Sequence, residues 1–564
     1  MKASDRATLP GAGSRAALSG SRAALSGSRA PLSGSSAALS TLGVCCLLAA
    51  GTARAQSDGE QGPPPGPGLV SGGLVYANDV ERAAATANDL VFRTLNADCN
   101  PGGVLDQIPS PTYSDLSGAR AGGPGPGPLC TPDAFFVYLN ARELVHTANE
   151  LQGQGPTIAS LGLDQEGLGL ALRWTAAEEL AAQGSMATQF ANSQLSTLAA
   201  RLTALSFGAA GFTTTGLYDW RGVRSPLLAQ AGDDAAVAQT GAGERYSPWG
   251  GFLNYGFGYG SKAPTALEDA FDFDGSEFTL GADYRLPGNI VLGGIVGSTR
   301  QNIDFDPAAS EISVVDGNVT SDGRSFMVFA LKQGERMTLS GSVGVQSLDY
   351  VIDRNIQYPS FNPNEDSIYS LARSKPDADV VTATFGFGYA FTWSKFTLEP
   401  TFDVESLDVT IGAFAEQRSI NLLSNAAESR RFDLVVSEQD VKSLRTSLGL
   451  RFQYVVTPRF GVVVPYWNVA LHDEHKNGSR TISSGYAALE NVLGRSTFNL
   501  PTDPADDSYL TASAGVSLVL RGGRQREAGG PIAGGLSGFF QYGTVKNREN
   551  YEDHVMTAGF RYEF

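Results

Sequence analysis

The sequence predicts an all-β transmembrane barrel of about twelve antiparallel strands, preceded by a small α-helical domain. Two observations lead to this fold class. Beyond Trp249, apolar and polar residues alternate with the period of two that a β-strand imposes on its two faces. Short turns also alternate with long polar connections along the same region, as in barrels of the bacterial outer membrane.

The segment from His554 to Phe564 shows the strand pattern most clearly. Apolar and aromatic residues occupy every second position, and small or polar residues fill the positions between. An exposed aromatic strand is a liability in a soluble sheet, whereas in a barrel its apolar face meets acyl chains. We therefore expect this segment to be a lipid-facing strand.

Eleven further strands are expected from the same alternation. The first lies near Gly250–Tyr259. The others are Glu277–Leu286, Ile290–Gly297, Phe326–Lys332, Met337–Gln346, Ala383–Trp393, Phe396–Val404, Leu448–Val456, Phe460–Ala470, Leu510–Leu520 and Leu536–Val545. With an even number of strands, the first strand begins and the last strand ends on the same, periplasmic side of the membrane. A soluble sandwich would need a second apolar face, which nothing in the sequence demands.

The N-terminus has the features of a secretory signal. Basic residues are followed by an apolar stretch over 37–50, and an Ala-Arg-Ala segment ends at Ala55. We expect 1–55 to be a signal peptide with cleavage between Ala55 and Gln56. Repeats of the type Gly-Ser-Arg-Ala-Ala-Leu-Ser lengthen its start, and a true start codon downstream of Met1 is the explanation we favour.

Between the signal and the barrel, the spacing of apolar residues becomes helical. Residues 56–77 are rich in Gly and Pro and predict a flexible leader, and 78–207 predict a small helical bundle. One helix should begin at Asn78 and another at Thr131-Pro132, with a third helical region over 164–205 that Gly184 interrupts. Residues 208–245 would be a linker, and 246–564 the barrel.

Two cysteines remain after cleavage of the signal. Cys99 would end the first helix and Cys130 would start the second, so a disulfide between them would staple an antiparallel helix pair. In an exported protein we favour this structural role over redox chemistry.

Charge and motif content exclude several functions. The net charge of -17 argues against a nucleic-acid partner, and no catalytic motif is present, so we expect no enzyme, no catalytic residue, no metal and no cofactor. His146 would be an exposed or capping helix residue. His472 and His475 would be solvated residues of an outer loop.

Charged residues on the polar phase of the expected strands predict a wet lumen. They could line a pore, grip a threaded helix, or simply pair with one another. The residues predicted to face the lumen are Glu277, Asp283, Arg285, Glu399, Asp403 and Arg451.

Three segments resemble the autotransporter β-domain of type V secretion systems: Gly251–Tyr259, Phe278–Arg285 and Gly559–Phe564. The resemblance implies a twelve-stranded, monomeric barrel in the outer membrane of a Gram-negative bacterium, with a helix through its pore. That helix would fall around 165–208 or in the linker. Outer-membrane lipid, the barrel assembly machinery and periplasmic chaperones are the implied partners, and Phe560, Tyr562 and Phe564 the implied assembly signal.

We therefore expect a barrel that anchors, and is able to translocate, a short helical domain. The helical region is neither a repetitive β-helix nor a recognisable enzyme, so its ligand is left open. The alternative is an outer-membrane channel or passive transporter with a periplasmic helical domain. Whether the helical domain is cleaved, and on which side of the membrane it lies, the sequence leaves open.

Overall fold

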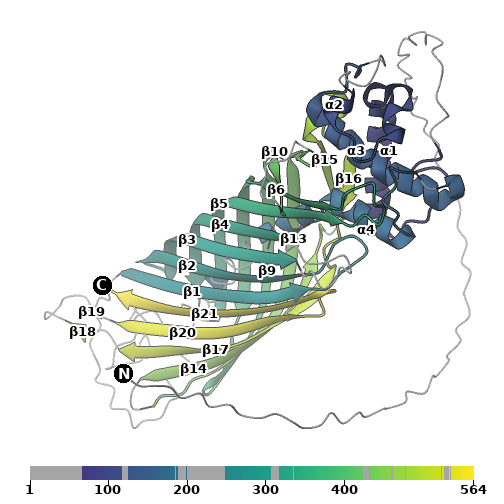
Figure 1. The fold of residues 1–564 in the computed structure, drawn as a ribbon. Helices are drawn as coiled ribbons and strands as arrows, with labels where there is room; N and C mark the ends of the chain where they lie inside the picture. Colours follow the sequence, from purple (N-terminus) through teal and green to yellow (C-terminus); the bar gives the residue numbers. More distant parts are fainter. Residues whose placement is uncertain are drawn as a thin grey trace, which may run out of the picture. The chain divides into compact units, whose positions relative to one another are not determined.

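The strands from Trp249 onward close into a twelve-stranded antiparallel barrel (Figure 1). The structure is a computed structural model, and it describes residues 66–116, 125–155, 157–184, 186–188, 198–199, 248–305, 317–334, 336–423, 431–458, 461–476, 478–521, 524–525, 532–533 and 535–564. The barrel strands are β1 (Trp249–Lys262), β2 (Phe271–Leu286), β3 (Ile290–Phe305), β4 (Asn318–Gln333), β5 (Met337–Tyr358), β7 (Asp377–Tyr389), β9 (Phe396–Ile411), β13 (Gln439–Tyr454), β14 (Val462–Glu474), β17 (Ser508–Arg521), β20 (Leu536–Lys546) and β21 (Tyr551–Glu563).

The pairing of the last strand with the first closes the barrel. Each strand pairs with the next along the chain, and β21 returns to pair with β1, with Gly250 opposite Glu563 and Lys262 opposite Tyr551. We call the end that holds Trp249 and Phe564 the terminal end, and the opposite end the loop end. The predicted strand number and antiparallel order are confirmed.

The outer wall carries the apolar residues of each alternation. Leu253, Tyr255 and Phe278 are exposed, while Asn254 and Thr279 between them are buried and hydrogen-bonded to each other across β1 and β2 (3.1 Å). At the terminal end, exposed aromatic side chains such as Trp249 and Trp393 supply an interfacial girdle. The wall is therefore apolar outside and polar inside.

Several strands extend further toward the loop end than the alternation predicted. β5 continues to Tyr358 and β3 to Phe305. The extensions carry polar residues on the outer face, such as the exposed ion pair between Arg300 and Asp322 (2.9 Å). Beyond the lipid an outward apolar residue is not required, and so the alternation that identifies a membrane strand is lost there.

At the terminal end, the connection after β17 is longer than the expected tight turn. It contains a two-stranded hairpin of β18 (Arg524–Gln525) and β19 (Ile532–Ala533). β8 (Phe391–Trp393) pairs with β9 at the same end.

The helical region consists of three main helices with short helical turns between them. The bounds are α1 (Asp79–Cys99), η1 (Pro101–Gln107), α2 (Tyr113–Leu116), α3 (Pro132–Asn149), η2 (Glu150–Gln154) and α4 (Gln165–Ala176). Asn78 caps α1 by accepting from the Glu81 amide (2.8 Å), and Thr131 caps α3 ahead of Pro132. Both predicted helix starts are therefore confirmed.

Two expectations about the helical region differ from the structure. The third region breaks at Ala177, which has a left-handed φ of 63°, whereas Gly184 lies inside a helical turn. Residues 66–77 are also held in place: the Leu69 amide donates to Asp89 (3.0 Å), and the Leu69 side chain is buried. The Gly and Pro composition concealed this contact, because a single buried Leu anchors the segment.

The helical region shares its core with the connections at the loop end. These connections form a four-stranded sheet of β10 (Phe414–Ala415), β12 (Leu434–Val436), β15 (Thr481–Tyr486) and β16 (Phe498–Pro501), and they also contain β6 (Ile368–Ser374), β11 (Gln417–Asn421), η4 (Ala487–Leu489) and α6 (Glu490–Leu493). Phe432, Tyr486 and Phe498 belong to the same buried cluster as Val91 and Leu144 of the helices. The expected bundle with a core of its own is therefore wrong: the helices and the loop end fold as one body.

Candidate functional site

The barrel lumen and the helices that cover its loop end form the candidate site. A cavity of about 360 Å³ lies in the lumen and is lined by polar residues of many strands. Four described residues that precede the first barrel strand also line it: Met186, Thr188, Leu198 and Ala199. The chain therefore enters the lumen after the helical region. The predicted linker over 208–245 lies outside the described residues, as do the predicted signal peptide and the cleavage site between Ala55 and Gln56.

The side chains predicted to face the lumen lie on the inner face of the wall. Glu277, Asp283, Arg285 and Glu399 are buried there, and Asp403 and Arg451 line the cavity. Two ion pairs link residues of this set to charged residues on other strands. Arg451 donates to Glu399 (3.1 Å) directly across β13 and β9, and Arg561 donates to Asp283 (2.9 Å). Paired charges of this kind are what a polar lumen accommodates.

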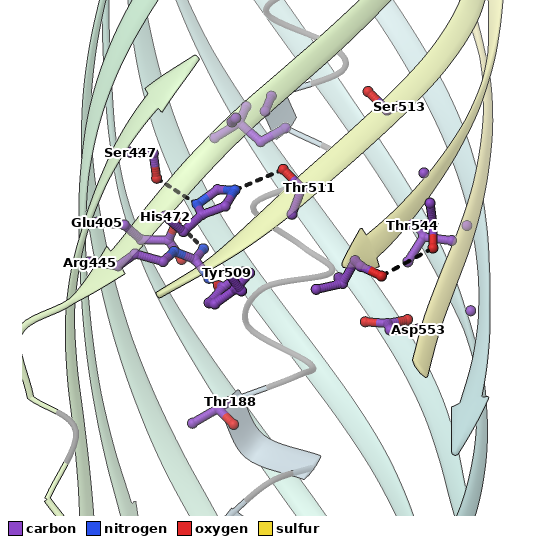
Figure 2. Close-up of a pocket in the computed structure, with 18 of the residues that line it drawn as sticks. Thr188, Glu405, Arg445, Ser447, His472, Tyr509, Thr511, Ser513, Thr544 and Asp553 are labelled. Atoms are coloured by element: carbon purple, nitrogen blue, oxygen red, sulfur yellow. Dashed lines mark hydrogen bonds and ion pairs between the residues drawn. The ribbon is translucent and has the colours of Figure 1, made fainter. Parts of the chain in front are cut away.

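A second polar group, which sequence reasoning missed, lies closer to the loop end. Figure 2 shows Arg445 pointing toward Glu405 and Tyr509, and the guanidinium donates to Glu405 at 2.6 Å. Beside it, His472 bridges the Ser447 hydroxyl (2.6 Å) and the Thr511 hydroxyl (2.8 Å). Arg445 and Glu405 stand directly opposite each other on β13 and β9, so an expected register could have identified them.

The expected positions of two histidines were wrong. His472 lies in β14 and points into the lumen, because that strand runs past the predicted boundary to Glu474. His146 is half-buried, bonded through Nδ1 to Thr157 (3.0 Å) and packed edge-on against Phe92. Burial, and then the nearby Arg142 charge, lowers the pKa of His146 to about 4. His475 is exposed and bonded to Thr446 (2.9 Å).

One side of the lumen is apolar and contacts Leu198. Leu198 packs in a buried cluster on the walls of β1, β3 and β4. The cluster consists of Leu198, Phe252, Val291, Ile295, Met327, Phe329 and Leu331. The lumen therefore has an apolar side that contacts Leu198 and a polar side that carries the cavity and its charges.

We name the described residues from 66 to 184 the helical cap. Its polar contacts with the barrel reach residues at the loop end. Tyr486 donates to Asn88 of α1 (2.9 Å), Arg142 of α3 donates to Glu365 (3.4 Å), and Arg173 of α4 donates to Asp269 (2.7 Å).

Two further contacts to the loop end strengthen this attachment. The Phe361 amide donates to the Leu161 carbonyl (2.8 Å), and Arg431 pairs with Glu143 (3.2 Å). These contacts come from four different connections of the barrel, so the cap lies across its loop end.

A fully buried ion pair supports the cap from below. Arg354 of β5 binds Glu416 through two hydrogen bonds (2.8 and 2.7 Å) and also reaches the carbonyls of Phe432 (2.7 Å) and Trp174 (3.5 Å). Arg354 and Glu416 are 1% and 0% exposed. Sequence reasoning missed both, since each is a single charged residue in a long connection with no motif around it.

This interface contains more carboxyl groups than arginines. Burial raises the pKa of Glu178 to about 8, although the Arg173 guanidinium binds it at 2.6 Å and opposes the shift. Burial likewise raises the pKa of Glu179 to about 7, against the attraction of Arg354. Asp269 and Glu416 add negative charge nearby, and Glu81 of α1 faces Arg173. The interface therefore favours protonated carboxyl groups.

The remaining predicted site residues are also placed. Cys99 and Cys130 form the predicted disulfide between the end of α1 and the start of α3. Phe560, Tyr562 and Phe564 are exposed on the outer face of the barrel. That position is compatible with an assembly signal, and this role stays a prediction.

Nothing in the described residues adds a metal or a helical membrane span. Within those residues, no group of three or more His, Cys, Asp or Glu side chains is arranged to hold a metal ion. None of the described helices is both long and apolar enough to cross a bilayer.

Comparisons with known proteins agree with this architecture. The family model described as "Autotransporter beta-domain" matches residues 251–524. No curated protein matches the chain. Among solved structures, the translocator domain of the autotransporter NalP from Neisseria meningitidis is 14% identical, covering 58% of this chain and 90% of that one, with a TM-score of 0.39.

Two other solved structures show the range of similar barrels. The transport unit of the autotransporter AIDA-I from Escherichia coli is 13% identical, covering 56% of this chain and 90% of that one, with a TM-score of 0.35. The toluene transporter TbuX from Ralstonia pickettii is 8% identical over the same shares, with a TM-score of 0.33. All three TM-scores are below 0.5.

The family match, in contrast, falls on the barrel whose strands and lumen are described above. The β-domain of this family is a translocator located in the Gram-negative outer membrane, and it is not an enzyme. The C-terminal part of this chain, matched over residues 251–524, therefore belongs to the autotransporter β-domain family, and the chain is an outer-membrane protein of the autotransporter type.

Proposed function

We propose that the barrel, residues 246–564, carries the helical cap across the outer membrane and then retains it as a folded cover on the outer face. The observation that supports this proposal is the attachment of the cap to the loop end through Asn88, Arg142 and Arg173. Retention follows from the shared core, because separating the cap would expose buried apolar surface on both sides.

The orientation of the barrel decides which side of the membrane the cap occupies. In outer-membrane barrels the short turns are periplasmic and the longer loops are extracellular. The turns at 287–289 and 394–395 lie at the terminal end, and the connections at 359–376 and 475–507 lie at the loop end. The loop end would thus be extracellular, and the cap with it.

The path of the chain fits export. It leaves α4 at the loop end, passes Met186 and Leu198 in the lumen, and begins β1 at the terminal end. A segment that has moved outward through the barrel would be left in this arrangement, with the last exported residues at the outer mouth and the tether inside.

A channel with a periplasmic helical domain is the less favoured function. It would place the helices at the terminal end, whereas the contacts of the cap described above are at the loop end. Met186, Thr188, Leu198 and Ala199 also lie in the part of the lumen that a solute would use. We further propose that the cap has no enzymatic activity, and that lipid, the barrel assembly machinery and periplasmic chaperones are the partners of this chain.

A cleavage experiment on whole cells tests the proposal. A recognition sequence for a specific protease would be inserted after Gly125, which is exposed with open space around it, and in a control strain at the terminal-end turn beside Lys395. Samples would be reduced before electrophoresis, because the Cys99–Cys130 disulfide spans the first site.

We expect the first site to be cleaved on intact cells and the second only after the outer membrane is permeabilised. Cleavage of the Lys395 site alone on intact cells would contradict the proposal. Cleavage of neither before permeabilisation would also contradict the proposal, because the cap would then not be exposed on the cell surface.

A further inference from the structure

The cap leads into the lumen through its last helical segment, residues 179–184, and the final turn of that segment is 181–184. The turn follows the break at Ala177 and precedes Met186, which lines the lumen cavity. Gln183 in this turn is completely buried. Its surroundings therefore determine how the chain is held at the outer mouth.

Three barrel residues from separate strands or connections reach this single turn. Arg480, just before β15, donates to the Ala181 carbonyl (2.8 Å), and Tyr350 of β5 donates to the Gln183 carbonyl (3.4 Å). Gln439 at the start of β13 donates to the Gln183 side chain (3.4 Å) and accepts from Arg480 (3.1 Å). We call Arg480, Tyr350 and Gln439 the collar.

Arg480 is the central member of the collar. Its amide and carbonyl are both bonded to Thr502 (3.3 and 2.9 Å), which fixes its backbone against the neighbouring strand. The side chain makes no ion pair within 4.0 Å among the described residues, and its charge instead meets a carbonyl of the turn. A hydrogen bond from a charged donor to a carbonyl is stronger than one from a neutral donor.

Gly184 allows this close approach. A Cβ on Gly184 would lie 2.2 Å from Arg480 Nη2 and 2.4 Å from Cζ, so any larger residue would displace the guanidinium. Gly184, in the segment that leads into the lumen, and Arg480, at the loop end of the barrel, are therefore complementary in size.

We propose that the collar sets the position at which the exported chain stops, by binding residues 181–184 at the outer mouth of the barrel. Arg480 acts as the main positioning residue, and Gly184 marks the turn that it binds. This inference rests on the proposed function, since a stopping position has meaning only for a chain that moves outward. Without the collar, the apolar contacts of Leu198 would be the principal hold on the segment deeper in the lumen.

The position of the chain can be read from the reactivity of a cysteine at Met186, which is 1% exposed. Met186→Cys would be introduced in a background in which Cys45 and Cys46 are serine, and intact cells would be treated with a membrane-impermeant maleimide. We expect Met186→Cys to be protected in the parent chain. Arg480→Ala should let the segment slide and raise the labelling rate at least tenfold.

Matched variants separate positioning from a general loss of structure. Gly184→Val should raise labelling by displacing the same guanidinium, and Arg480→Lys should restore part of the protection by keeping a cation at that place. Arg495→Ala is the control, because Arg495 is an exposed arginine of the same connection that pairs only locally with Glu490. Heat-modifiable migration of the barrel would show that each variant is folded.

A reference cysteine distinguishes the failure of this inference from failure of the proposed function. Thr86→Cys on the exposed face of α1 should label on intact cells in every variant. If Thr86→Cys is not labelled, the cap is not on the outer face. If it is labelled while Met186→Cys stays equally protected in folded Arg480→Ala and Gly184→Val chains, the collar does not set the position.

Discussion

Removal of the Arg354 side chain should detach the cap while leaving the barrel intact. Arg354 makes two hydrogen bonds to Glu416 and one to the Phe432 carbonyl, and it also reaches Trp174 at the end of α4. In Arg354→Met, Glu416 would be left buried without its cation. Breaking a buried ion pair by removing one partner costs about 3–5 kcal/mol.

This free-energy cost can be converted into a change in the population of the open cap. With a factor of ten for every 1.4 kcal/mol, the open population of the cap should rise by about 10²- to 10⁴-fold. The assay is hydrogen exchange by mass spectrometry on the purified full chain in detergent at pH 6. Amides of α1 and α4 should exchange faster by this factor, and amides of β1 and β21 should be unchanged.

Two controls test the physical reason. Arg300→Met removes an exposed ion pair with Asp322, in which the side chains are 68% and 61% exposed, and should change exchange little, because water screens such pairs. Arg354→Met combined with Glu416→Leu should recover most of the lost protection, since no buried charge remains. Unchanged exchange of α4 in Arg354→Met would refute the argument.

Three further predictions follow from the same contacts. Burial raises the pKa of Glu178 to about 8 and that of Glu179 to about 7, so protonation of these two carboxyl groups favours the docked cap. Their contribution to the stability of the docked cap is complete below the ordinary carboxyl pKa of about 4.5 and is lost as the pH rises through 7–8. Cap exchange, corrected for its intrinsic rate, should therefore accelerate from pH 6 to 9, and a flat profile would count against these shifts. Replacing both Cys99 and Cys130 by Ala should lower the stability of the cap against urea by roughly 3–4 kcal/mol, because the bond closes a 31-residue separation; an unchanged midpoint would contradict this. Leu198→Ala should reduce protease resistance around residue 198 by the equivalent of about 2–5 kcal/mol, whereas the lipid-facing Leu253→Ala should not. Equal effects would argue against the apolar contact.

The membrane-embedded part of the barrel could be predicted because lipid imposes a rule on every second residue. Phe278, Leu280 and Tyr284 face outward, and Glu277 and Asp283 face inward, as the phase of that strand indicated. The rule ends where the lipid ends. The predicted strand from Met337 therefore ended at Gln346, although β5 continues to Tyr358.

The cap interface could not be predicted for a different reason. Its contacts join single residues far apart in sequence, such as Asn88 with Tyr486, and no local pattern marks either partner. Apolar residues of the long connections, including Phe432 and Phe498, were diluted by polar neighbours. The disulfide was accessible to prediction, because two cysteines at helix boundaries leave one sensible pairing.

The most direct test of the account is the side of the membrane on which α1 lies. Thr86→Cys, exposed on α1, and Ser394→Cys, at a turn of the terminal end, would each be labelled with a membrane-impermeant maleimide on intact and on permeabilised cells. The account predicts that Thr86→Cys labels on intact cells and that Ser394→Cys labels only after permeabilisation. Labelling of Thr86→Cys only after permeabilisation would contradict it, because the cap would then be periplasmic.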